Sequence, residues 1–119
     1  MTAAHHKTDN LIMIVDKNDC QIDNRVQKVM NLDPMPDKFK AFNWEVFEMD
    51  GHDMQNILDT VNKAKEVKGK PSVIIATTKM GRGVSFMEDD YRWHGVPPND
   101  EQGKIALTEL AETKFGDFV

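Results

Sequence analysis

The stretch Leu11-Ile12-Met13-Ile14-Val15-Asp16-Lys17-Asn18 opens with a continuous apolar run and then turns polar. A short apolar run of this kind suits a strand that is covered on both faces, as in a parallel sheet. Further along, Ser72-Val73-Ile74-Ile75-Ala76-Thr77 has the same character and predicts a second buried strand. Residues 44–49 are rich in aromatic and β-branched side chains, so they predict another strand between these two in the sequence.

Helical patterns separate the strands. The clearest helix is predicted from apolar side chains that recur at helical spacing, namely Met54, Ile57, Leu58, Val61 and Ala64. Asp53 is expected to cap the start of this helix, and Gly69 is expected to end it.

Further helices are predicted from their capping residues. Asp33 followed by Pro34 is typical of an N-cap and a first helical turn, and Asn43 can close that helix in the left-handed conformation. Either Asn99 or Asp100 is expected to cap a last helix. Strands that alternate with helices indicate the α/β class, with a partial parallel sheet and flanking helices.

The length of 119 residues suits one small domain, and residues 1–119 are interpreted as a single incomplete one. Residues 1–7 resemble the tail of a helix with no N-cap in front of it, which indicates truncation. In parallel sheets, ligands bind beyond the carboxyl ends of the strands. The polar loops 16–24 and 79–98 both leave that edge, so we expect a site where they meet.

Composition excludes several classes of partner. The formal net charge of −5 argues against nucleic acid, because phosphate backbones need clustered basic side chains. The single cysteine, Cys20, cannot form an internal disulfide and fits a reducing compartment. The apolar runs are too short to span a bilayer, and the first residues lack the apolar core of a signal peptide. A cytoplasmic protein is therefore expected, with neither nucleic acid nor a membrane as partner.

The loop 16–24 carries the most informative chemistry. Oxygen ligands from a side-chain amide and from a backbone carbonyl two residues further on suit a hard cation such as Mg²⁺ or Ca²⁺. A turn stabilised by the Asn side chain, without any ligand, explains the same composition. The residues of this loop alone leave both interpretations open.

Short motifs follow one another along nearly the whole chain: Ala4-His5-His6-Lys7, Ile14-Val15-Asp16-Lys17-Asn18, Cys20-Gln21-Ile22-Asp23, Asp50-Gly51-His52-Asp53, Gly81-Arg82-Gly83-Val84-Ser85-Phe86-Met87 and Trp93-His94-Gly95-Val96-Pro97. In this order and spacing they resemble the transketolase family, in the half that binds thiamine diphosphate. Each motif is weak alone, whereas the ordered series is specific. The resemblance implies a fragment of the thiamine diphosphate-binding fold, the later part of that domain.

The resemblance also implies roles for particular residues. Asn18 and the backbone carbonyl of Cys20 would ligate Mg²⁺ or Ca²⁺, which bridges to the diphosphate, and Ile22 would pack near the cofactor. His94 would reach the diphosphate and the transferred substrate and assist proton movement. A histidine can accept or donate a proton near neutral pH. Without the resemblance, a lone histidine on a loop is more often part of the polar surface.

By resemblance, the complete enzyme transfers a two-carbon ketol unit between sugar phosphates in the pentose phosphate pathway. The family's upstream Gly-Asp-Gly motif and the glutamate that activates the cofactor are absent from this sequence. We therefore expect the isolated chain to be inactive until the remaining segments or a partner subunit complete it in a homo- or hetero-oligomer. Alternatives are a non-catalytic truncated remnant, a partner-dependent interaction module, or a related thiamine diphosphate enzyme such as a deoxyxylulose-phosphate synthase.

The sequence departs from the family pattern at a few positions. Asp19, Asn24 and Asn43 stand where the family often has glycine, and Asp and Asn tolerate a left-handed backbone better than most other residues. The cofactor loop is therefore expected to keep its geometry. Asp89 and Asp90 add negative charge near a loop expected to face a diphosphate, which counts against a site there.

Overall fold

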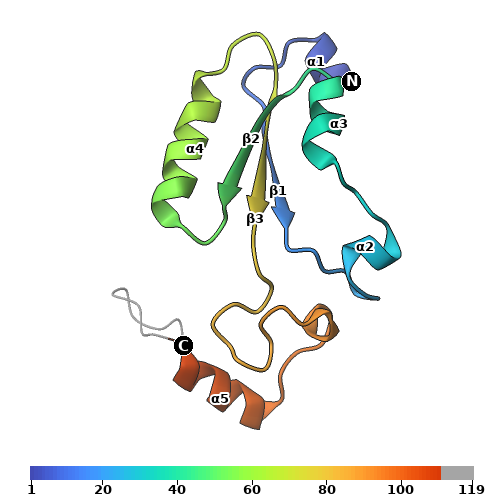
Figure 1. Cartoon of the computed structure of the whole chain (residues 1–119). Coiled ribbons are helices and arrows are strands. Elements are labelled where there is room, and N and C mark those ends of the chain that lie inside the picture. The colour runs from blue at the N-terminus through green and yellow to red at the C-terminus, as the bar shows by residue number, and fades with distance from the viewer. Residues whose placement is uncertain (111–119) are drawn as a thin grey trace. The chain divides into compact units, whose positions relative to one another are not determined.

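The computed structural model describes residues 1–110 of the chain (Figure 1). Its elements are α1 (Thr2–His5), β1 (Ile12–Lys17), α2 (Val26–Val29), α3 (Met35–Ala41), β2 (Glu45–Asp50), α4 (Met54–Glu66), β3 (Ser72–Thr77), a short 3-10 helix η1 (Tyr91–Trp93) and α5 (Asp100–Glu109). They fall into two compact units. The sheet unit comprises Met1–Asn18 and Met30–Thr78, and the loop unit comprises Asp19–Val29 and, among the described residues, 79–110.

The sheet unit contains a parallel sheet with the strand order β1-β3-β2, which confirms the predicted fold class. The central strand β3 pairs with both neighbours, so Ile74 lies between Ile14 of β1 and Phe47 of β2. Residues 72–76 are all buried, as their apolar sequence predicted. A strand in the middle of a parallel sheet has no exposed face, which explains its lack of polar alternation.

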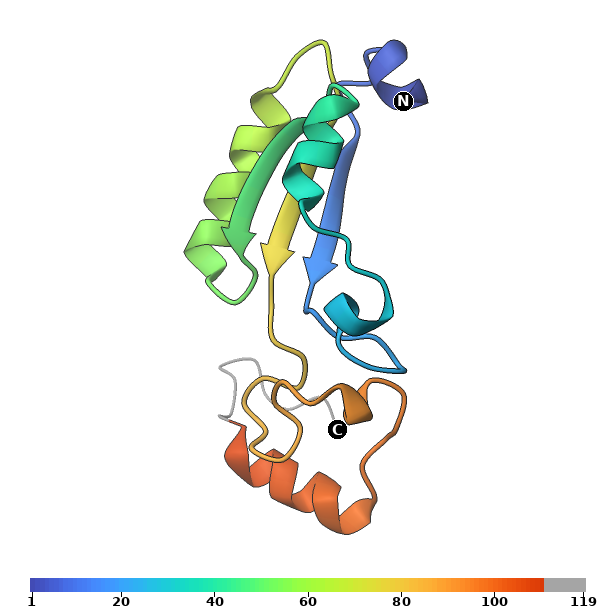
Figure 2. The ribbon, with the colours of Figure 1, turned by 45° about the vertical axis from the view of Figure 1, so that its right-hand side comes forward.

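The helices α4 and α3 cover opposite faces of this sheet (Figure 1, Figure 2). On one face, Ile74 packs with Met49 of β2 and Ala64 of α4. On the other face, Ile75 packs with Met35 of α3. Successive residues of β3 therefore contribute to two separate apolar clusters, because side chains alternate between the faces of a strand.

The strand β1 differs from the prediction that it is covered on both faces. Met13 and Val15 pack in the cluster beneath α3, but Ile14, which points to the opposite face, is 55% exposed. The helix on that face, α4, packs chiefly against β2 and β3. Among the described residues, β1 is therefore an edge strand with one face largely uncovered.

Two of the predicted helix caps are confirmed. The carboxylate of Asp53 accepts hydrogen bonds from the amides of Gln55 (2.9 Å) and Asn56 (3.1 Å) at the start of α4. Asn99 caps α5 and exchanges hydrogen bonds with Gln102 in a capping box, which decides between the two predicted caps.

No helix within residues 1–110 is long and apolar enough to cross a membrane.

The prediction that Asp33 caps α3 is wrong. The helix begins at Met35, and its N-cap is Pro34, which makes no side-chain hydrogen bond to the helix. The amide of Asp33 donates to the side chain of Asn31 (3.0 Å), so Asp33 belongs to the turn before the helix. At the other end, Asn43 adopts the predicted left-handed conformation, with φ of 63°.

The end of α4 also differs from the prediction. The helix ends at Glu66, and Val67 is extended, so the stop comes earlier than Gly69. Gly69 has φ of 76°, and its amide donates to the carboxylate of Asp9 (3.0 Å). Gly69 therefore turns the chain toward β3 after the helix has ended.

Candidate functional site

Thr78 joins the carboxyl ends of β1 and β3. Its amide donates to the carbonyl of Lys17 (3.2 Å), and its hydroxyl donates to the carboxylate of Asp16. Both polar loops therefore leave the sheet from one edge, where ligands of parallel sheets bind. Asn18 follows β1 at this edge as the last residue of its segment of the sheet unit. Sequence reasoning missed Thr78, whose one signal is its position directly after a strand.

The turn that contains Cys20 is held by its own backbone. Cys20 forms an isolated antiparallel bridge with Arg25. The amide of Val26 donates to the carbonyl of Asp19 (3.0 Å). Asp19 has the expected left-handed conformation, with φ of 57°, whereas Asn24 does not adopt it. The turn therefore keeps its shape without glycine at these two positions.

The side chain of Cys20 is buried, and its sulfur accepts a hydrogen bond from Nη1 of Arg25 (3.3 Å). Burial raises the pKa of the thiol, by more than the Arg25 guanidinium lowers it. The sulfur is therefore enclosed by the protein and already engaged by Arg25. An amide oxygen from Asn18 and a carbonyl oxygen from Cys20 fit a hard cation, which prefers oxygen.

Ile22, at the far end of this turn, is 71% exposed. An apolar side chain at that exposure is available to pack against a ligand or a partner. No cluster of three or more His, Cys, Asp or Glu side chains able to hold a metal occurs in residues 1–110. Amide and carbonyl oxygens are also ligands that a hard cation accepts.

The long loop after β3 is folded rather than extended. Gly81 has φ of 64°, and a side chain there would come within 2.7 Å of the carbonyl oxygen of Met87. Gly83 has φ of 91°, and its amide donates to the carboxylate of Glu88 (3.0 Å). Glycine is required at Gly81 by a close approach inside the loop itself.

His94 follows η1 directly and is exposed. Its amide donates to the carbonyl of Tyr91 (3.0 Å), which fixes the backbone at the end of the 3-10 helix. The preceding Trp93 packs edge-to-face on Phe86, with ring centroids 5.3 Å apart. The imidazole is thus presented to solvent from an anchored turn.

Asp89 and Asp90, which add negative charge to this loop, each have an arginine partner. Nη1 of Arg25 donates to the Asp89 carboxylate (2.5 Å), and Nη2 donates to the Asp89 carbonyl. The Asp90 carboxylate caps η1 by accepting from the amide of Arg92 (3.1 Å) and also accepts from Nε of Arg92 (2.9 Å). These hydrogen bonds hold the pKa of both carboxyl groups below the usual range. Sequence reasoning missed Arg25, because no periodic pattern links residues so far apart.

The predicted site residues are divided between the units. Asn18 belongs to the sheet unit, whereas Cys20, Ile22 and His94 belong to the loop unit. Within the loop unit, Arg25 connects the segment that carries Cys20 and Ile22 to the segment that carries His94. The structure therefore brings two of the predicted loop elements into one compact body.

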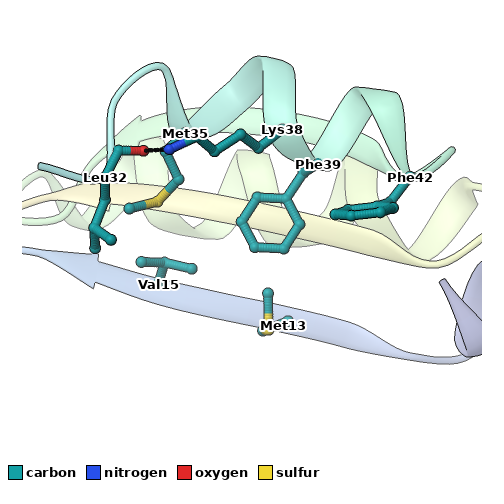
Figure 3. Close-up of a pocket in the computed structure, with 7 residues that line it drawn as sticks. All are labelled: Met13, Val15, Leu32, Met35, Lys38, Phe39 and Phe42. Atoms are coloured by element: carbon teal, nitrogen blue, oxygen red, sulfur yellow. Dashed lines mark hydrogen bonds between the residues drawn. The ribbon is translucent and has the colours of Figure 1, made fainter.

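The sheet unit has a separate pocket of about 440 Å³ between β1 and α3 (Figure 3). Figure 3 shows that its lining is almost wholly apolar: Met13, Val15, Leu32, Met35, Lys38, Phe39 and Phe42. Nζ of Lys38 donates to the carbonyl of Leu32 (2.9 Å). None of the predicted site residues lines this pocket, and its one charged side chain, Lys38, is engaged by the chain itself, so the pocket is not the predicted site.

The chain is an α/β domain whose parallel sheet sends two polar loops from its carboxyl edge, the edge at which such sheets bind ligands. One loop carries Asn18 and Cys20, and the other carries His94. The family model described as "Transketolase, thiamine diphosphate binding domain" matches residues 1–115. This chain belongs to that family.

Similar proteins carry related names. The chain is 38% identical to an apulose-4-phosphate transketolase subunit of Phocaeicola vulgatus, over 94% of this chain and 40% of that protein. It is 39% identical to "6-deoxy-6-sulfo-D-fructose transketolase subunit SqwG" of Clostridium sp., over 92% of this chain and 40% of that protein. The crystal structure of transketolase from Campylobacter jejuni superposes with a TM-score of 0.84 at 33% identity, over 91% of this chain and 17% of that chain. The chain thus spans about 40% of the length of these two curated relatives.

Proposed function

We propose that this chain supplies the metal- and diphosphate-binding part of a transketolase, which transfers a two-carbon ketol unit between sugar phosphates. The observation that carries the proposal is the match of the family model to residues 1–115, together with the folded loops that present Cys20 and His94. Relatives named as transketolase subunits favour this function over a deoxyxylulose-phosphate synthase. We place the protein in the cytoplasm.

Particular residues would hold the cofactor and its cation. The amide oxygen of Asn18 and the carbonyl oxygen of Cys20 would ligate Mg²⁺ or Ca²⁺, and Ile22 would pack against the cofactor. Thiamine diphosphate, when bound, supplies the carbanion chemistry of ketol transfer. The imidazole of His94 would bind the diphosphate and move a proton at the substrate.

A partner would complete the enzyme. Relatives of greater length are named as single subunits of a transketolase, which supports a second, different polypeptide as the partner of this chain. The chain alone is expected to bind the cofactor weakly and to show no ketol transfer. Addition of a polypeptide that carries the remaining transketolase segments is expected to give activity.

Calorimetric titration with thiamine diphosphate, with and without Mg²⁺, tests the proposal. We expect binding that depends on Mg²⁺ and weakens by about tenfold in Asn18→Ala, the equivalent of about 1.4 kcal/mol. Asn62→Ala, an exposed asparagine on α4, is the matched control and is expected to bind like the unmodified chain. Absence of binding by a folded chain would instead support a non-catalytic remnant or an interaction module.

A further inference from the structure

Arg25 is shared by both segments of the loop unit. Its guanidinium contacts Cys20, five residues earlier in the chain, and Asp89, 64 residues later. Nη1 donates to Sγ of Cys20 (3.3 Å) and to the carboxylate of Asp89 (2.5 Å), while Nη2 donates to the carbonyl of Asp89. One side chain thus engages a buried thiol, a carboxylate and a backbone carbonyl.

The contacts of Arg25 connect two candidate site residues, Cys20 and His94. Cys20 is itself the residue whose carbonyl would ligate the cation. On the other segment, Asp89 is followed by Asp90, which caps η1, and the residue that ends η1 is His94. Every contact in this series lies within the loop unit.

We propose that Arg25 is a positioning residue that couples the Cys20 turn to the His94 loop. This inference rests on the proposed function, because it assigns a purpose to the coupling of these two segments. Arg25 fixes the distance between a cation ligand and a proton-transfer group, and it neutralises Asp89 on a loop that would face an anionic ligand. In this role Arg25 acts through its neighbours Cys20 and Asp89.

The geometry explains why arginine is needed there. A planar guanidinium can point separate N–H groups at separate acceptors, whereas a lysine ammonium concentrates its charge at one point. The Arg25 and Asp89 side chains are 33% and 51% exposed, and ion pairs at such exposure contribute little to stability. The contacts of Arg25 therefore matter for the relative position of the two segments more than for the folding of the chain.

Nuclear magnetic resonance of the full chain, titrated with Mg²⁺ alone, tests the coupling. In the unmodified chain we expect Mg²⁺ to shift the backbone resonances of the Cys20 turn and of His94. In Arg25→Gln, the turn should still respond, and the His94 response should be lost. Arg25→Lys should fail to restore it, because a lysine ammonium lacks the planar array of separate N–H donors that a guanidinium provides.

Lys28→Gln is the matched control, because it removes one positive charge from the same segment at an exposed position on α2. It should respond to Mg²⁺ like the unmodified chain. A His94 shift that persists in Arg25→Gln, or that never accompanies the shift of the Cys20 turn, would overturn the inference. If Arg25 had only a structural role, Arg25→Gln would alter the backbone resonances before Mg²⁺ is added. It would not remove the His94 response to Mg²⁺ while leaving the response of the Cys20 turn intact.

The failure of the proposed function gives a different result. If Mg²⁺ shifts neither segment, the cation site is absent, and the coupling is then judged from the metal-free spectra. In that case, Arg25→Gln should still move the His94 amide resonance and should change the rate at which Cys20 reacts with a thiol reagent, relative to Lys28→Gln. Unchanged His94 resonances and unchanged thiol reactivity would contradict the coupling as well.

Discussion

The sheet unit and the loop unit are each stabilised internally by a different kind of interaction. In the sheet unit, β3 is buried from residue 72 to residue 76 and joins two apolar clusters. In the loop unit, charged side chains make many of the connections: Arg25 bonds to Asp89, and the Glu109 carboxylate accepts from both the amide and the hydroxyl of Ser85. The scaffold is thus built by burial, whereas the part that would face the ligand is built by directed polar contacts.

The two tryptophans allow each unit to be followed by itself. Trp44 packs on Phe39 in the sheet unit, and Trp93 packs on Phe86 in the loop unit. A Trp93→Phe chain reports on the sheet unit through Trp44, and a Trp44→Phe chain reports on the loop unit through Trp93. Denaturant unfolding of these single-tryptophan chains can therefore sharpen or break the comparison.

The largest effect is expected from Ile74→Ala, followed through Trp44. Ile74 is fully buried, so the substitution removes apolar contacts and leaves a cavity, which costs about 3 kcal/mol in the free energy of unfolding. Ile14→Ala is the matched control, because Ile14 pairs with Ile74 in the sheet but is largely exposed. We expect the control to cost less than about 1 kcal/mol. Equal losses would show that β1 is covered as well as β3.

Gly81→Ala should act on the loop unit, followed through Trp93. The substitution forces a side chain into the left-handed conformation and against the backbone of Met87, so we expect a loss of about 2 kcal/mol. Gly95→Ala is the control, because a side chain there would meet no atom within 4 Å. If both substitutions have the same effect, the loop does not depend on the close approach at Gly81.

Asp53→Ala should have a smaller effect, on the sheet unit. It removes the hydrogen bonds that cap α4, and N-caps contribute about 1 kcal/mol. Asp53→Asn keeps a side-chain oxygen and is expected to keep most of the stability. The free energy of unfolding from Trp44 fluorescence measures both. A full loss with asparagine would indicate that charge matters there more than capping.

Acid should weaken the loop unit with the smallest effect of all. Bonds from Gly83 and Arg25 hold the pKa of Glu88 and Asp89 below the usual range. A carboxyl group whose pKa is lowered by folding contributes stability above its ordinary pKa of about 4, and this stability is lost as the pH falls through the lowered value. On acidification below about pH 4, Trp93 should therefore respond before Trp44. Simultaneous changes would count against a loop unit held by charge.

The contrast between a buried sheet unit and a polar loop unit explains which parts of the fold could be predicted from the sequence. The apolar runs and helical spacing predicted the strands, α4 and the buried β3, because periodicity records burial directly. The apolar run did not predict that Ile14 is exposed, because that depends on where α4 lies. The capping pattern at Asp33 failed because the place of Asp33 in a turn depends on its neighbours.

The candidate site was predicted only in its components. Motifs indicated Asn18, Cys20, Ile22 and His94, but no pattern in the sequence pointed to Arg25 as the link between segments. Asp89 and Asp90 were expected to be unfavourable from their charge alone, and the structure gives each an arginine partner. Polar contacts between distant segments produce no periodic pattern in the sequence, so they were identified only from the structure.

The most direct test of the account is the fluorescence of the Trp44→Phe chain during titration with thiamine diphosphate and Mg²⁺. Trp93 directly precedes His94, so cofactor binding at the loop unit should change its emission only when Mg²⁺ is present. Trp44, in the Trp93→Phe chain, should change little. A Trp93 signal that stays constant in a folded chain, or that responds equally without Mg²⁺, would contradict a metal-dependent cofactor site in these loops.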